Sequence, residues 1–174
     1  MLKRHRVKLM SAAICCLMSW LPVSGSLPAK EWRGITPLHS TRANVRKLLG
    51  QPLPMSSKFT DSYDVEEGRV HFMYVRQRCE QGLPADWGNW DVPPETVANI
   101  EIYLSKEVPL KELNIPDIEK YKWYTDDTLT TYYHNKEEGV EYSVRDGMVH
   151  RITYGPRGRD KYLLCKKDTP VIRY

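Results

Sequence analysis

Histidines and acidic residues are the first candidates for chemistry, because their side chains transfer protons and bind metal ions. His71 and His150 fall in alternating segments typical of strands, so neighbouring strands could bring them together. A zinc site would need a third ligand, which the sequence does not indicate. Asp126, Asp127 and His134 could form an acid/base cluster, but adjacent aspartates before a strand more often make a solvated turn. We therefore predict no catalytic residue and no metal ligand.

The common catalytic motifs are also missing. The sequence contains no G-x-S-x-G, H-E-x-x-H, G-x-x-x-x-G-K-[ST], C-x-x-C or G-x-G-x-x-G. These patterns mark hydrolases, zinc proteases, phosphate-binding loops, thiol redox sites and dinucleotide-binding sites. The sequence therefore predicts no cofactor and favours a non-enzymatic protein. An enzyme with an unrecognised site around the histidine-bearing strands is the alternative.

A long loop with two tryptophans is the segment most suggestive of binding. Residues 79–94 are rich in glycine and proline and contain Trp87 and Trp90. Long loops in compact domains often bind a partner, and tryptophan offers a large contact area. Alternatively, one or both indole rings fold back as a lid over the sheet, since paired exposed tryptophans promote association. The lid is the favoured interpretation, and a partner-binding loop is the alternative.

Residues 1–26 have the order of a secretory signal peptide. Four basic residues precede an apolar stretch at 9–23, and small residues follow at 24–26. That stretch is shorter than the roughly 20 residues of a membrane-spanning helix. A lipidated cysteine follows a small residue, and neither Cys15 nor Cys16 does. Both are therefore predicted to be ordinary apolar residues of the leader. We expect residues 27–174 to form one domain, exported to the periplasm or the extracellular space, without a stable membrane span.

The net charge of +4 comes from this leader, which contains four basic residues and no acidic one. Residues 27–174 then carry 22 basic and 22 acidic side chains. Proteins that track nucleic-acid phosphates need a surplus of clustered bases. We therefore expect the partner to be a protein or small ligand outside the cytoplasm, and not nucleic acid.

Cys79 and Cys165 are the only cysteines outside the leader. In an exported protein they are most simply a disulfide. Such a bond would close a loop of about 85 residues and contribute about 4 to 5 kcal/mol in the loop-entropy model. A redox pair is the alternative, but neither cysteine has a C-x-x-C context.

The remaining pattern predicts an α+β domain, with a short N-terminal helix packed on a mostly antiparallel sheet. Ser40 and Thr41 are N-cap candidates, and Gly50 and Pro52 end the helix. Strands are expected at 63–65, 70–76, 97–104, 129–134, 140–145 and 148–154, with one helical turn at 110–113. Asp146-Gly147 between two alternating runs predicts a type I′ hairpin.

The segment around the helix resembles the opening of a family of uncharacterised secreted bacterial proteins. The similarity lies in W-R-G-I-T-P-L at 32–38, S-T-R at 40–42, Val45 and L-L-G-Q-P at 48–52. It continues through 94–97 to Cys165 and implies secretion, but no activity. Residues 40–52 are also similar to the first helix of small outer-membrane-assembly lipoproteins and of β-lactamase-inhibitor-like α+β domains. That likeness implies an envelope-associated module or an inhibitor of a secreted enzyme, although Asn44 replaces the usual acidic residue.

Overall fold

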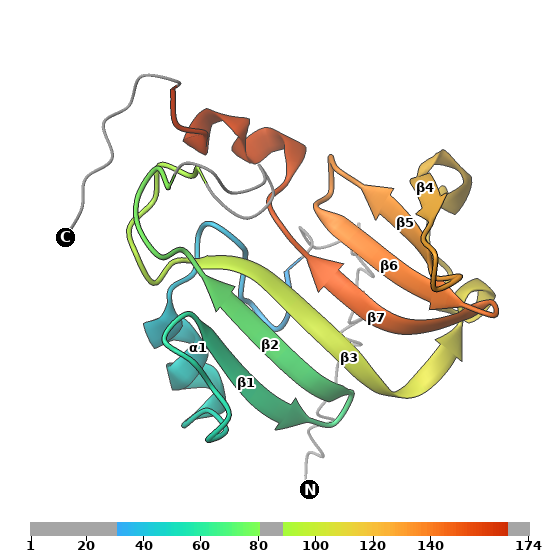
Figure 1. Ribbon diagram of the computed structural model, residues 1–174, viewed down its shortest axis with the longest axis horizontal. Coiled ribbons are helices and arrows are strands. Elements are labelled where there is room, and N and C mark those ends of the chain that lie inside the picture. Colours follow the sequence, from blue (N-terminus) through green and yellow to red (C-terminus); the bar gives the residue numbers. More distant parts are fainter. Residues whose placement is uncertain (1–30, 81–88, 167–174) are drawn as a thin grey trace, which may run out of the picture.

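Seven antiparallel strands form one sheet in the computed structural model, which describes residues 31–80 and 89–166 (Figure 1). Their order across the sheet is β1-β2-β3-β7-β6-β5-β4. The strands are β1 (Thr60–Val65), β2 (Gly68–Tyr74), β3 (Val97–Pro109), β4 (Lys122–Thr125), β5 (Thr131–Asn135), β6 (Val140–Arg145) and β7 (Met148–Tyr154). Strands β1 to β3 and strands β4 to β7 are each consecutive, and the two groups join where β3 pairs with β7. The predicted mostly antiparallel α+β fold is confirmed.

The β6–β7 hairpin has the bounds and the turn that the sequence predicts. Asp146 and Gly147 both have positive φ, at 51° and 76°, as a type I′ turn requires. The sequence predicts no strand at β4. The remaining strands differ mainly at their ends: β1 begins at Thr60, and β3 continues to Pro109. The expected strand at 129–134 begins only at Thr131, because Leu129 has a φ of 60° and belongs to the preceding turn.

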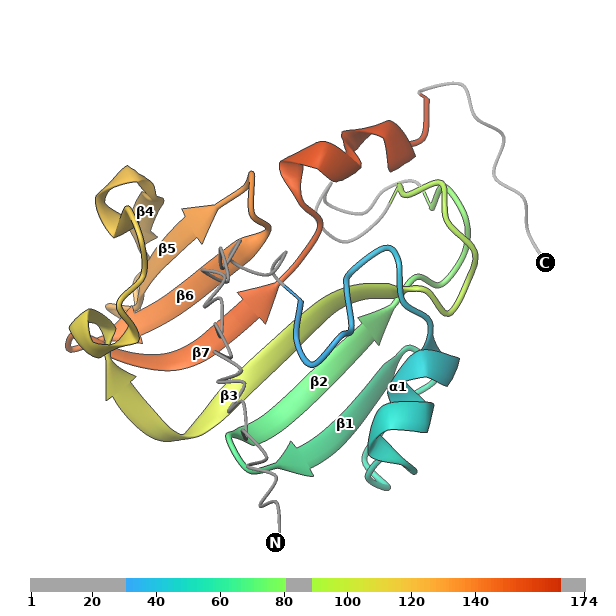
Figure 2. The same ribbon diagram turned by 180° about the vertical axis from the view of Figure 1, so that it is seen from behind.

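The predicted helix is α1 (Arg42–Leu49). Thr41 caps it: its hydroxyl accepts from the Asn44 N–H, and the Asn44 side chain accepts from the Thr41 N–H at 2.8 Å. Gly50 ends the helix with a φ of 80°. Figure 2 shows α1 and the segment before it in front of β1 to β3, where Val45 is fully buried. The helix thus covers one face of this half of the sheet.

The apolar core lies on that same face. Under α1 the buried residues include Phe72, Ile100 and Ile102. On the β5 to β7 half, Val140, Tyr142 and Val149 are covered by two short 3-10 helices, η1 (Leu110–Leu113) and η2 (Ile118–Lys120). No helix of the described residues is long and apolar enough to cross a membrane.

Alternation places the polar strand residues on the opposite face, which we call the polar face. Its members are Ser62, His71, Glu101, Tyr103, Lys122, Tyr124, Tyr132, His134, Glu141, Ser143, Arg151 and Thr153. After β7, a third 3-10 helix, η3 (Gly158–Leu163), turns across the end of the sheet (Figure 1). The sequence gives no prediction for η3, whose polar residues show no apolar periodicity.

Cys79 and Cys165 form a disulfide with their Cα atoms 5.6 Å apart, as predicted. It fastens η3 to the loop that precedes β3. The backbone N–H of Cys165 donates to Asn89 at 3.0 Å, and that of Asp91 donates to Leu163 at 2.7 Å.

Candidate functional site

One row of the polar face crosses five strands, with a histidine at each end, a glutamate next to each histidine and a threonine in the middle. The register places His134 beside Glu141, Glu141 beside Thr153, Thr153 beside Glu101, and Glu101 beside His71. Adjacent strands lie about 4.8 Å apart, so these five side chains lie next to one another in one row. Nδ1 of His134 is 3.2 Å from a carboxylate oxygen of Glu141. The two groups can share a proton.

Arg151 lies at the centre of the neighbouring row. Its Nε donates to the Ser143 hydroxyl at 3.1 Å, and its guanidinium carbon is 5.8 Å from the ring centre of Tyr103. Its terminal nitrogens lie 3.9 Å from Glu101 and 4.0 Å from Glu141. Burial acts to lower the pKa of Arg151, but the Tyr103 hydrogen bond and the two carboxylates outweigh it and raise that pKa. Arg151 is therefore a fixed cation between two acids.

A pocket of about 650 Å³ opens on this face and reaches η3. Five of its lining side chains are cationic: Lys122, Lys136, Arg151, Arg157 and Lys161. Two lining side chains are acidic, Glu101 and Glu141, and Arg151 lies close to both. The pocket walls thus carry a surplus of positive charge.

Arg157 belongs to the wall beside η3, where a buried carboxylate fixes it. Asp160 is 1% exposed and accepts from the Arg157 backbone N–H at 2.9 Å and from Arg157 Nε at 3.4 Å. The other Asp160 oxygen lies 2.9 Å from Nε2 of His39. Burial would raise the pKa of Asp160, but these hydrogen bonds outweigh burial and lower it. Asp160 is an anion that orients Arg157.

Three polar atoms in the pocket walls are shielded from solvent and lack a hydrogen-bond partner among the described residues. They are Nε1 of Trp90, Oγ1 of Thr153 and Nη1 of Arg157. A buried donor without an acceptor costs about 1 to 3 kcal/mol. The described residues therefore leave these three atoms of the pocket walls unsatisfied.

Trp90 is 6% exposed and packs with Leu38, Val75 and Val92. This placement agrees with the lid interpretation and differs from an exposed partner-binding tryptophan. The reason is the disulfide, which holds the loop against η3: Cys79 N–H donates to the Trp90 carbonyl at 3.0 Å. Trp87 lies outside the described residues.

His71 and His150 do not meet, because β3 lies between their strands β2 and β7. Instead, Nδ1 of His71 is 2.8 Å from the Ser62 hydroxyl. Burial lowers the pKa of His71, against the opposing effect of Glu101. Ser62 is 3% exposed, so a substrate carbonyl has no access to its hydroxyl as a nucleophile. This pair orients His71 at the edge of the polar face.

One group of three residues in the described ranges has the spacing of a metal site. Ligand atoms of Cys79, Asp91 and Cys165 lie within 4.8 Å of one another. The metal ligand is a thiolate, and both sulfurs are bound in the disulfide. The oxidised protein therefore offers only Asp91 there.

Asp126 forms the turn that the sequence favours over an acid/base cluster. Its carboxylate accepts from the Thr128 N–H at 2.9 Å, the Thr130 N–H at 3.0 Å and the Tyr132 hydroxyl at 2.8 Å. The Thr128 hydroxyl also donates to it at 2.7 Å, and this bond, together with the others, lowers the pKa of Asp126 to about 2. Its carboxylate is thus occupied in fixing the β4–β5 turn.

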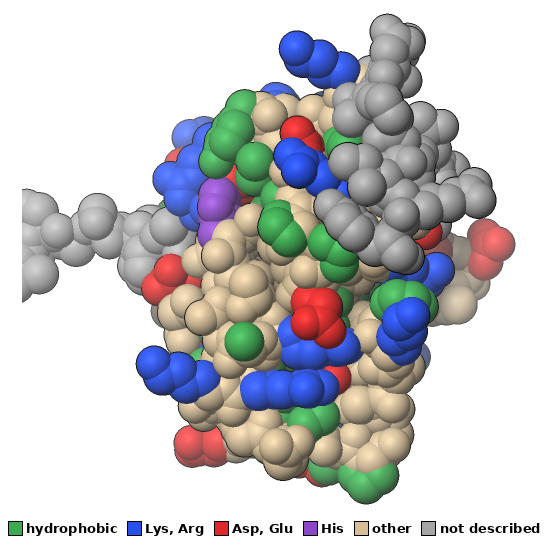
Figure 3. Space-filling view, turned by 90° about the vertical axis from the view of Figure 1, so that its left-hand side faces the viewer, with side chains coloured by type: hydrophobic (Ala, Val, Ile, Leu, Met, Phe, Trp, Pro, Cys, Tyr) green, Lys and Arg blue, Asp and Glu red, His purple; other side chains and the backbone are tan. Residues whose placement is uncertain are grey.

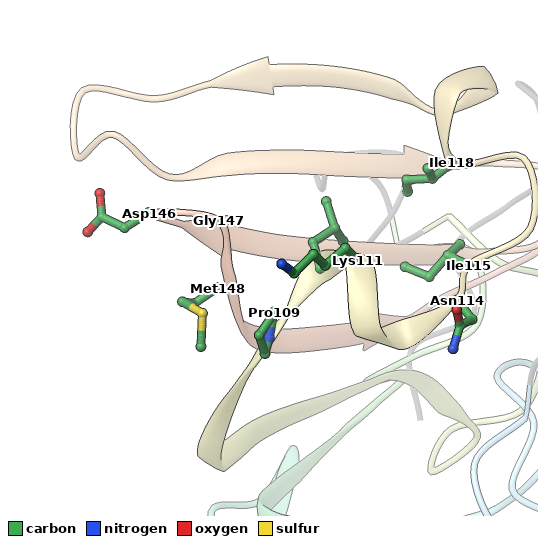
Figure 4. Close-up of a pocket in the computed structure, with 9 residues that line it drawn as sticks. Pro109, Lys111, Asn114, Ile115, Ile118, Asp146, Gly147 and Met148 are labelled. Atoms are coloured by element: carbon green, nitrogen blue, oxygen red, sulfur yellow. The ribbon is translucent and has the colours of Figure 1, made fainter.

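A second pocket, also of about 650 Å³, lies beside the β6–β7 turn (Figure 4). It is mostly apolar, with Pro109, Ile115, Ile118 and Met148 in its walls. The polar face has the denser set of charged and hydrogen-bonding groups. We therefore take the pocket on the polar face as the candidate site.

The opposite edge of the molecule has a different character. Figure 3 shows basic and acidic side chains intermixed on the side that carries α1 and β1. One exposed pair joins β2 to β1, where Arg69 lies 2.8 Å from Asp64. This side carries mixed charge.

Sequence reasoning missed the residues at the centre of the site: Glu101, Glu141, Arg151 and Arg157. The signal for the first three is their position on the polar side of alternating strands. Strand order alone decides whether such residues gather, and the sequence does not provide it.

Comparison with models of protein families gives no match, and comparison with curated proteins gives none either. Among solved structures, the chain is similar to a DUF4309 family protein, YjgB, from Bacillus subtilis. The two are 13% identical with a TM-score of 0.48, over 72% of this chain and 84% of that chain.

Proposed function

We propose that the protein is an exported binding module, without catalytic activity, that holds a small polar ligand in the pocket on the polar face. The observation that supports this most directly is that Trp90, Thr153 and Arg157, which all line the pocket, each have a buried polar atom without a partner among the described residues. A ligand that supplies these partners removes the cost of leaving the atoms unsatisfied.

The fixed geometry of the pocket supports the same proposal. Arg151 is held by Ser143, Tyr103 and two carboxylates, and Arg157 is held by Asp160. Side chains that are already ordered lose little entropy when a ligand binds, so more of the interaction energy appears as affinity. A few polar groups held in fixed positions in a pocket orient a ligand and provide specificity.

Fragment screening by NMR tests this proposal, because a ligand site binds weak fragments where other surfaces do not. The protein, ¹⁵N-labelled and recovered after expression of the full chain, is titrated with several hundred neutral, cationic and anionic fragments. We expect saturable shifts to concentrate at Glu101, Glu141, Arg151 and Thr153. Shifts that cluster at the apolar pocket around Met148, or no saturable shifts at all, would contradict the proposal.

A pocket-filling variant provides the matched control. Thr153→Trp places an indole in the pocket and should abolish fragment binding. Thr125→Trp adds the same ring on an exposed position of β4 and should leave binding unchanged. Both variants are compared by thermal unfolding, so that a loss of folding is separated from a filled pocket.

An enzyme is the second candidate, because the His134 and Glu141 pair lines the same pocket and can transfer a proton. Each bound fragment is therefore followed by NMR for chemical conversion. Conversion that His134→Gln abolishes would establish the enzyme. Unchanged fragments with retained binding in His134→Gln support the binding module.

Export is part of the proposal and is supported by the leader pattern and by the disulfide. The intact mass after expression with the native leader tests it. Loss of residues through Gly25 or Ser26, with two thiols appearing only after reduction, is expected. An uncut chain with free thiols would contradict export, and a lipid-bearing mass beginning at Cys15 or Cys16 would indicate a lipoprotein.

A further inference from the structure

We infer that the end of the pocket beside η3 is an oxyanion subsite, which takes a carboxylate or phosphate group of the ligand. The inference rests on the proposed function, because it names the chemistry of one part of the ligand in the same pocket. Its residues are Arg157, Trp90 and Thr153, with Lys136 and Lys161 at the rim.

The hydrogen-bonding character of these residues decides whether the ligand group that binds them is negatively or positively charged. The indole N–H of Trp90 and the guanidinium of Arg157 can only donate, and the Thr153 hydroxyl can donate. A ligand ammonium group cannot accept from them, whereas each oxygen of a carboxylate or phosphate can accept two hydrogen bonds or more. The group that satisfies this wall is therefore rich in acceptors.

Arg157 is ordered in advance for this role. It is 8% exposed, and Asp160 accepts from both its backbone N–H and its Nε. This leaves Nη1 without a partner among the described residues. Asp160 thus holds the guanidinium in place while a terminal nitrogen is left for a ligand, and arginine binds oxyanions more strongly than a neutral donor does.

The local charge favours an anion. Lys136 and Lys161 line the pocket together with Arg157. Glu137 lies 3.7 Å from Lys161, and Asp160 pairs with Arg157. Glu101 and Glu141 flank Thr153 across the sheet, and Arg151 lies close to both acids. The five cations of the pocket walls exceed these four acids by one, which suits a singly charged oxyanion. Lys136 and Lys161 are both exposed, so they attract the ligand and are more affected by salt than Arg157 is.

Titration with inorganic phosphate, sulfate and acetate tests the subsite. The protein from full-chain expression is kept at constant ionic strength with NaCl, and the indole N–H signal of Trp90 is followed by NMR. Trp90→Phe assigns that signal. We expect saturable shifts at Trp90 and Arg157, with a Kd near about 1 mM, as is typical of an isolated small group. Stronger binding of acetate would identify a carboxylate, and stronger binding of phosphate a phosphate.

Matched variants separate the subsite from general charge effects. Arg157→Gln should weaken binding at least tenfold. Replacing Lys136 and Lys161 by Gln should weaken it two- to fivefold, while the same change at the exposed Lys106 and Lys120 should have no effect. If Arg157→Gln does not fold, Thr153→Val provides the test, because it removes one hydroxyl and keeps the side-chain shape.

Linear, unsaturable shifts that are equal in wild type and Arg157→Gln would overturn the inference. If uncharged or cationic fragments still bind the polar face in that case, the proposed function stands and only the oxyanion subsite fails. If neither fragments nor anions bind, both are wrong.

Discussion

Asp160 and His39 are 121 positions apart in the chain, yet Oδ1 of Asp160 lies 2.9 Å from Nε2 of His39. Through its other oxygen, the same carboxylate accepts from Arg157. Asp160 thus joins the segment before α1 to the segment after β7, and it orients a residue of the candidate site.

Replacing Asp160 by Asn should lower the free energy of unfolding by about 2 to 4 kcal/mol, because it leaves the buried Arg157 without its counter-charge. Urea unfolding measures this loss. Asp117→Asn is the control: Asp117 pairs with Lys120 at 3.1 Å, both residues are exposed, and such pairs contribute less than about 1 kcal/mol. Equal losses in the two variants would show that the buried network contributes no more to the free energy of unfolding than an exposed ion pair does.

The lowered pKa of Asp160 makes the free energy of unfolding depend on pH in the acidic range. Its pKa in the folded protein is below the ordinary value of 3.8. Its contribution is therefore present above about pH 4, and it is lost as the pH falls through the folded pKa. Unfolding free energies from pH 7 to pH 3 should fall more steeply in wild type than in Asp160→Asn. Asp126 also titrates at low pH, but it is common to both proteins and cancels in the difference. Parallel curves would contradict the assignment.

Removing the disulfide should cost stability and also loosen the pocket wall. The double variant Cys79→Ser, Cys165→Ser should lose about 4 kcal/mol in urea unfolding, since the bond closes a loop of about 85 residues. Fragment binding on the polar face should weaken as well, because the bond holds Trp90 and η3 together. Reductant should reproduce both effects in wild type and have none in the double variant.

Two hydroxyls in the centre of the sheet should respond in opposite ways. Thr153→Val removes a buried oxygen with no partner among the described residues, so it should raise the free energy of unfolding by about 1 to 3 kcal/mol. Ser143→Ala removes an oxygen that accepts from Arg151 at 3.1 Å and should cost about 1 to 3 kcal/mol. Thermal and urea unfolding compare them. A loss in Thr153→Val would mean that its hydroxyl is already satisfied.

Two glycines with positive φ differ in the space around them. A Cβ at Gly68 would lie 2.0 Å from the Tyr103 carbonyl oxygen, whereas a Cβ at Gly147 meets nothing within 4 Å. Gly68→Ala should therefore cost about 3 kcal/mol or more, and Gly147→Ala about 1 to 2 kcal/mol from backbone strain alone. Chemical unfolding of both variants tests how tightly the β1–β2 turn packs on β3.

Local pattern predicts much of this fold. Alternation and the Asp146-Gly147 turn predict the first and last residues of β6 and β7, and the capping residue Thr41 predicts the start of α1. The sheet order depends on the pairing of β3 with β7, which are far apart in the chain, and no local feature encodes it. The cluster around Arg151 follows from that pairing, so it could not be predicted. The position of Trp90 likewise depends on contacts with η3.

Two covalent connections join strands β1 to β3 with strands β4 to β7. One is the backbone between β3 and β4, and the other is the Cys79–Cys165 disulfide. Cleavage at residues 114–117, between η1 and η2, would leave β1 to β3 on one piece and β4 to β7 on the other. Cys79 and Cys165 lie on opposite sides of that cut. The nicked protein would therefore remain one covalent molecule, with β3 and β7 still paired, and it would separate into two fragments only when reduced and unfolded.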